Sequence, residues 1–138
     1  MRRHRLLAVV LVLDLAVSCS ATPDTIADVS GWLGDWVLGG DTSAALSTPT
    51  LRIESDGSIV GSTGVNRYRG KLDLTELAQG RWATAPLVTT MMAGSEAAMA
   101  LESRVTDALS GATDIELCDG ALTLLRDGKE LLRFARAQ

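Results

Sequence analysis

The chain of 138 residues has a single histidine, His4, close to the N-terminus. Imidazole is the usual proton shuttle near neutral pH and a frequent zinc ligand, so its absence from the rest of the sequence excludes most hydrolytic triads and zinc sites. No two carboxylates stand out as a glycosidase pair, and the chain lacks the Gly-Lys-Ser/Thr sequence of a phosphate-binding loop. We therefore expect no catalytic residue, no metal, no cofactor and no enzymatic activity.

Aromatic residues make up only 4% of the chain, and cysteine occurs twice. The core must therefore be mainly aliphatic, which argues against an aromatic-lined nucleotide or sugar site. Cys118 alternates with Ile115 and Leu117, as a small apolar side chain in a strand does, and nothing places it in a basic pocket that would activate a thiol. Trp32 and Trp36 are expected in the core or a lid, on a short strand or on a helical turn before it.

The first 18 residues are predicted to be a lipoprotein-type signal peptide. Three arginines among the first five residues precede an apolar run over 6–17, which at about a dozen residues is too short to span a bilayer. The run ends in Leu-Ala-Val-Ser-Cys at 15–19, which resembles a bacterial lipobox, although Asp14 and Ala16 depart from the usual pattern. In such sequences, signal peptidase cuts before a cysteine that carries a diacylglyceryl group.

We accordingly expect Cys19 to be the site of lipid attachment and the protein to be anchored to the cell membrane or envelope. Residues 19–29 are predicted to form a small, polar tether, followed by one domain over 30–138. Plain secretion and an uncleaved anchor are the alternatives if the lipobox is not used.

Removal of residues 1–18 makes the remaining chain more acidic. The signal takes away three arginines and one aspartate, which leaves ten basic and sixteen acidic residues and a formal charge of −6. Such a domain has no electrostatic reason to bind nucleic acid. Its one basic cluster is Arg67, Arg69 and Lys71, whose period of two places all three side chains on one face of a strand.

Alternating apolar residues predict a mainly antiparallel β domain. The expected strands cover 35–38, 50–54, 58–62, 68–74, 81–84, 114–118, 121–125 and 130–134. Asp-Gly pairs at 56–57, 119–120 and 127–128 predict hairpins, because both residues tolerate the positive φ of a type I′ turn.

One helix is predicted after residue 94, with Ser95 as its N-cap and its end at 110–111. Its apolar positions share one face, and Glu102 is expected on the opposite, polar face. The fold class is therefore α+β, a curved sheet or partly closed barrel with one packed helix.

The glycine-rich stretch 57–70 contains the residues that could contact a ligand or partner, Asn66, Arg67, Tyr68 and Arg69. Asn66 is expected in a turn or left-handed conformation, with its side chain bonded to nearby backbone. For Asn66, Arg67 and Tyr68 a structural corner is favoured over ligand contact, and the arginines are expected to be exposed.

These landmarks together resemble the META domain, the fold of the HslJ-like heat-shock proteins and of many small bacterial lipoproteins. The resemblance is carried by segments 34–38, 49–57, 61–70, 90–94 and 122–134, and Gly-x-x-Gly-x-Asn-Arg-Tyr-x-Gly at 61–70 is its most specific part. It implies a non-enzymatic envelope lipoprotein with a role in stress tolerance or envelope maintenance. No feature identifies a protein partner.

The resemblance has two further implications. Many META domains carry a pair of cysteines where this chain has Val65 and Gly94, so this domain is expected to fold without that disulfide, with Val65 packed under the helix. META domains are also similar in shape to some lipid-binding secretion pilot proteins. A module for a hydrophobic or lipid-like ligand, with Met91, Met92 and Met99 lining an internal cavity, is therefore the alternative function.

Overall fold

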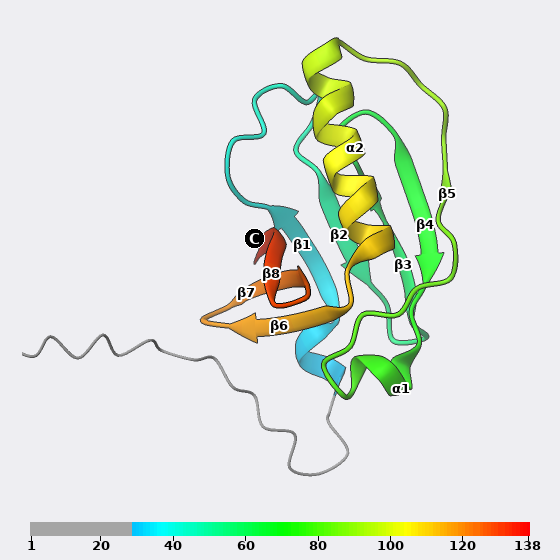
Figure 1. The fold of residues 1–138 in the computed structure, drawn as a ribbon, viewed down its shortest axis with the longest axis vertical. Coiled ribbons are helices and arrows are strands. Elements are labelled where there is room, and N and C mark those ends of the chain that lie inside the picture. Colours follow the sequence, from blue (N-terminus) through cyan, green and yellow to red (C-terminus); the bar gives the residue numbers. More distant parts are fainter. Residues whose placement is uncertain (1–28) are drawn as a thin grey trace, which may run out of the picture.

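The computed structural model describes residues 29–138, which form one curved sheet, one long helix and two short helical segments (Figure 1). The predicted signal, Cys19 and nearly all of the tether lie outside the described residues. The elements, in chain order, are η1 (Val29–Trp32), β1 (Gly34–Leu38), β2 (Thr50–Ile53), β3 (Ser58–Ser62), β4 (Arg67–Lys71), α1 (Leu74–Leu77), β5 (Val88–Thr89), α2 (Glu96–Gly111), β6 (Asp114–Cys118), β7 (Ala121–Arg126) and β8 (Lys129–Arg136).

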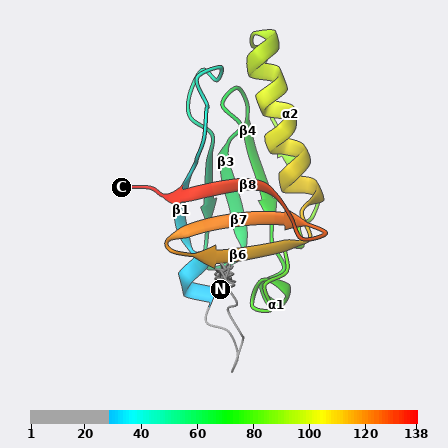
Figure 2. The ribbon, with the colours of Figure 1, turned by 60° about the vertical axis from the view of Figure 1, so that its left-hand side comes forward.

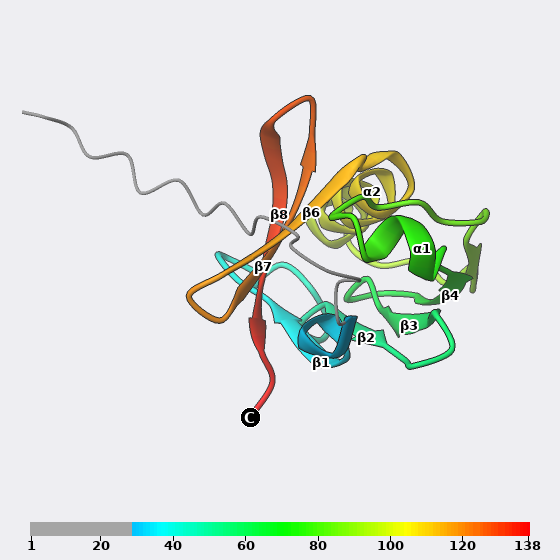
Figure 3. The same ribbon diagram turned by 90° about the horizontal axis from the view of Figure 1, so that it is seen from below.

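The eight strands pair in the order β5-β4-β3-β2-β1-β8-β7-β6, with every neighbouring pair antiparallel. The end strands β5 and β6 do not pair with each other, so the sheet is curved but open, and it is not a closed barrel. Strands β6, β7 and β8 run crosswise to β3 and β4 (Figure 2). Seen from below, α2 lies on the concave side of the curve (Figure 3). The predicted α+β class is confirmed.

Two of the three predicted turn types are confirmed. Asp119 and Asp127 have φ values of 50° and 52°, and the glycine after each is also positive, as a type I′ turn between β6, β7 and β8 requires. The β2–β3 hairpin is present, but the type I′ turn predicted for it is wrong, because Gly57 has a positive φ and Asp56 does not. The Gly57 amide donates to the carbonyl of Glu54, which makes this turn one residue longer.

Helix α2 begins where it was predicted to begin. The Ser95 hydroxyl accepts a hydrogen bond from the amide of Ala98 at 3.1 Å and so caps one of the four free N–H groups of the first turn. The apolar face is buried as expected. The prediction for Glu102 is wrong, since this side chain lies on the buried face of the helix.

The space between α2 and the sheet is filled by large apolar side chains. Trp36, Phe134 and Leu109 are all at most 1% exposed and belong to one cluster that takes in residues from most of the strands. Trp36 is in β1 and donates from Nε1 to the carbonyl of Trp32 in η1, so both local structures expected for this pair are present. The Arg136 guanidinium covers the Trp36 ring at 4.0 Å.

The prediction of a strand over 81–84 is wrong. This segment makes only isolated bridges, from Leu72 to Thr84 and from Arg81 to Asp114. Its position is instead fixed by Trp82, which is buried and donates from Nε1 to the Leu109 carbonyl of α2 at 2.8 Å. The expected strand over 68–74 also ends early, because Asp73 caps the short helix α1.

No helix within residues 29–138 has both the length and the apolar character needed to cross a membrane.

Candidate ligand pocket

The corner between β3 and β4 is organised around the side chain of Asn66, which is 3% exposed. Its Nδ2 donates to the Met92 carbonyl at 3.0 Å and to Glu102 Oε1 at 2.5 Å. Its Oδ1 accepts from the Thr90 hydroxyl at 2.8 Å and from the Met92 amide at 2.6 Å. The amide of one side chain therefore connects the sheet corner, the segment after β5 and helix α2.

The backbone of this corner is fixed by Thr63, which is also buried. Its hydroxyl accepts from the Asn66 amide at 2.9 Å, while its own amide donates to the Asn66 carbonyl at 2.8 Å. Asn66 is in a turn, but its φ is not positive, so the left-handed alternative is wrong. Its side chain does bond backbone, as expected, although that backbone is 26 residues away and not nearby.

Glu102 gives this network a buried carboxylate. Its Oε1 accepts from Asn66, and its Oε2 is buried with no hydrogen-bond partner among the residues that the structure describes. A buried polar atom is costly unless it is hydrogen-bonded, so the bond from Asn66 Nδ2 stabilises the position of α2 against the sheet corner.

Tyr68, at the middle of β4, points to the concave side and is 4% exposed. Its hydroxyl donates to the Thr50 carbonyl of β2 at 2.7 Å, across the intervening strand β3. Only glycine fits beneath the ring, because a Cβ at Gly61 would lie 2.5 Å from the tyrosine oxygen. Burial raises the pKa of the Tyr68 hydroxyl well above its usual value, so it remains a protonated donor.

Val65 and Gly94 lie against each other at the top of the sheet corner. A Cβ built on Gly94 would be 3.2 Å from Cγ2 of Val65 and 3.3 Å from Cβ of Ala98 in α2. The valine thus packs beneath the start of the helix. The two positions at which the resemblance places a cysteine pair are therefore in contact, and here an apolar contact fills that place.

Arg67 and Arg69 point away from the core, on the convex face of β4. Neither guanidinium has a hydrogen bond or salt bridge to another described residue, whereas four other basic side chains pair with carboxylates. Those pairs are Arg52–Asp35, Lys71–Asp56, Arg81–Glu76 and Arg133–Glu130. The two arginines therefore offer their full hydrogen-bonding capacity to solvent or to a ligand.

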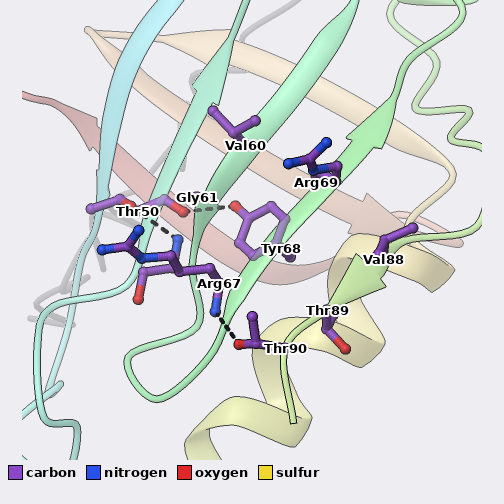
Figure 4. Close-up of a pocket in the computed structure, with 10 residues that line it drawn as sticks. Thr50, Val60, Gly61, Arg67, Tyr68, Arg69, Val88, Thr89 and Thr90 are labelled. Atoms are coloured by element: carbon purple, nitrogen blue, oxygen red, sulfur yellow. Dashed lines mark hydrogen bonds between the residues drawn. The ribbon is translucent and has the colours of Figure 1, made fainter. Parts of the chain in front are cut away.

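An open pocket of about 730 Å³ lies beside these arginines, over β3, β4 and β5 (Figure 4). The Arg67 side chain extends toward Thr50, and the Arg69 side chain lies beside Val60. The lining comes from short segments of four strands and the residue after β5: Thr50, Val60, Gly61, Ser62, Arg67, Tyr68, Arg69, Val88, Thr89 and Thr90.

The pocket lining contains hydroxyls and guanidinium groups but no carboxylate, imidazole, thiol or amine. Several of its hydroxyls serve the fold, because Thr50 accepts from the Ser62 amide and Ser62 accepts from the Gly64 amide. A nucleophilic hydroxyl needs a general base within hydrogen-bond reach, and none of these side chains provides one. Within 29–138, no group of three or more His, Cys, Asp or Glu side chains is placed to hold a metal ion.

The structure divides the four residues predicted for ligand or partner contact into two pairs. Asn66 and Tyr68 are buried and bonded within the fold, while Arg67 and Arg69 are exposed at the pocket. Sequence reasoning missed Val60 and Val88 as pocket residues. Val60 could have been placed on the convex face from the alternation of β3, whereas a strand of two residues such as β5 carries no periodic signal.

The prediction that three methionines line an internal ligand cavity is wrong for Met91 and Met92. Met91 is 94% exposed and Met92 is 59% exposed, so both lie on the surface at the segment that leads into α2. Any apolar ligand surface that uses them would be external.

An open antiparallel sheet curved around one long helix, with a pocket on its convex side, defines a small α+β domain. The chain belongs to the META domain family, whose model matches residues 26–138. No curated protein matches it. A solved NMR structure superposes with a TM-score of 0.57 at 20% identity, over 74% of this chain and 87% of the other, which supports the fold alone.

Proposed function

We propose that this chain is a bacterial cell-envelope lipoprotein whose META domain acts by binding and not by catalysis, in stress tolerance or envelope maintenance. The observation that carries the proposal is the surface pocket, which pairs two unpartnered arginines with apolar side chains and has no general base. Such a lining can hold a ligand or partner but has no group to move a proton at neutral pH.

The envelope location rests on the lipobox-like sequence at 15–19, which precedes the domain. A lipid on Cys19 would hold the domain at the membrane surface through a tether of about ten residues. The domain itself then needs no spanning segment. An anchored domain can also use weak contacts, because tethering raises the effective concentration of anything on the same membrane.

Replacement of Cys19 by Ala is expected to abolish incorporation of a fatty-acid probe in a bacterial host, because the thiol is the acceptor of the diacylglyceryl group. The matched control is Cys118→Ala, which removes the chain's other cysteine and should leave labelling intact. Labelling is measured by gel fluorescence after click chemistry. Persistent labelling of the Cys19→Ala variant would rule out the anchor.

A functional readout separates anchoring from activity. In a host that lacks the gene, wild-type chain is expected to restore tolerance to an envelope-damaging detergent, and Cys19→Ala is expected to restore it poorly. Equal restoration by both chains would show that the anchor is not needed for the role.

A further inference from the structure

The convex face of β3–β5 concentrates positive charge on an acidic protein. The full chain has a formal charge of −4, yet Arg67 and Arg69 project from the same side of one strand without a carboxylate partner in the described part of the chain. Their Cα atoms are two residues apart, about 7 Å along the strand. That spacing allows both guanidinium groups to reach one acidic group.

The strand register makes one end of the pocket polar and the other end partly apolar. Arg67 lies opposite Ser62, so this row is polar. Arg69 lies opposite Val60 on one side and Val88 on the other, so in this row a cation stands between two apolar side chains. Val88 is 64% exposed. One end of the pocket thus favours an anion, and the other end provides apolar surface next to a second cation.

We propose that this pocket binds a monomeric anionic amphiphile, with its phosphate or carboxylate held by Arg67 and Arg69 and its apolar chain lying over Val60 and Val88. Guanidinium groups bind such oxyanions with two parallel hydrogen bonds, which fixes orientation. A volume of about 730 Å³ lies in the range of small-molecule sites. The binding does not depend on the lipid anchor, so it can be tested independently of it.

Dodecyl phosphate, used below its micelle concentration, is a suitable probe for the purified full chain. Isothermal titration calorimetry is expected to show saturable binding of one molecule in this pocket. Inorganic phosphate lacks the alkyl chain, and dodecanol lacks the charged group. Each should bind at least about tenfold more weakly than dodecyl phosphate, because charged hydrogen bonds and apolar burial both contribute to affinity. Binding of phosphate or dodecanol alone as tightly as dodecyl phosphate would overturn the proposal.

The double variant Arg67→Ala/Arg69→Ala tests the site. Both side chains are exposed, so the fold should persist, and the affinity for dodecyl phosphate is expected to fall by about tenfold or more. The matched control is Lys129→Ala/Arg133→Ala, which removes two exposed cations from β8 and should leave affinity unchanged. Equal losses in both double variants would show a general charge effect and contradict the site.

The apolar part of the pocket is tested by Val88→Ser. This change should weaken dodecyl phosphate more than it weakens a six-carbon alkyl phosphate, because the shorter chain covers less of the apolar row. Equal loss for both ligands would contradict the proposed chain position.

Two further titrations test whether a different negatively charged ligand occupies the pocket. Vesicles of anionic phospholipid present the headgroup in a surface, and an oligoglutamate peptide presents carboxylates on a protein backbone. We expect the vesicles and the peptide to bind more weakly than monomeric dodecyl phosphate, and we expect their binding to be unchanged by Val88→Ser. Tighter, arginine-dependent binding of the vesicles or of the peptide would replace the proposed ligand by a membrane surface or an acidic protein segment, respectively.

Discussion

Replacement of Asn66 by Asp is expected to lower the free energy of unfolding by about 3–5 kcal/mol, because it exchanges the donor that faces Glu102 for a second carboxylate in a buried site. The Asn66 Nδ2 to Glu102 Oε1 distance of 2.5 Å leaves no room for water between the two groups. The bond to the Met92 carbonyl is lost as well. Since small domains are stable by about 5–15 kcal/mol, the change would consume a large share of that stability. Urea denaturation measures it.

The neighbouring residue provides the control. Arg67→Ala removes an exposed side chain and should change stability by no more than about 0.5 kcal/mol. Adding Glu102→Gln to Asn66→Asp returns a donor and an acceptor to the contact with their positions exchanged. We expect this double variant to be more stable than the sum of the two single changes by about 1–3 kcal/mol. An Asn66→Asp variant as stable as wild type would contradict the structural role of Asn66.

A disulfide introduced by Val65→Cys/Gly94→Cys is expected to raise the free energy of unfolding by about 2–4 kcal/mol. The Cβ position at Gly94 lies 3.2 and 3.5 Å from the two Cγ atoms of Val65, where a cysteine Sγ would stand. These separations suit an S–S bond of about 2 Å. The bridge would close a loop of about 30 residues that contains β4, α1 and β5, and so reduce the entropy of the unfolded chain.

The gain is measured as the difference between oxidised and reduced protein in urea. Wild type treated in the same way is the necessary control, because the chain already has Cys19 and Cys118. Val65→Cys alone should show no gain on oxidation. A double variant that forms no bridge, or that is destabilised when bridged, would show that the apolar contact does not occupy a disulfide-compatible position.

The sheet and its hairpins could be predicted because their determinants are local. Each of the turns at 119–120 and 127–128 contains both residues that a type I′ turn needs, and the flanking strands alternate. The turn at 56–57 has the same Asp-Gly sequence but a different backbone conformation. Its Asp56 side chain instead accepts from the Ser58 amide at 2.8 Å, a contact that the dipeptide alone does not indicate.

The corner could be predicted only in part, because its contacts are distant in sequence. Helical spacing places Glu102 on the apolar face, four residues after Ala98 and three before Val105, so its prediction for the polar face followed its charge and not its period. Its partner Asn66 is 36 residues away, and no local pattern indicates that contact. Trp82 likewise bonds a carbonyl 27 residues away, which fixes its segment without a strand. Arg67 and Arg69 were correctly placed on the outer face, since alternation along a strand is a local property.

In the proposed complex, the ligand contacts the convex face at Arg67 and Arg69 and not the space between α2 and the sheet. An NMR titration of the full chain with dodecyl phosphate tests this most directly by mapping amide chemical shifts. We expect the largest changes at Gly61, Arg69 and Val88, with little change at Val105 and Leu109 on the buried face of α2. Largest changes at Val105 and Leu109 would contradict it.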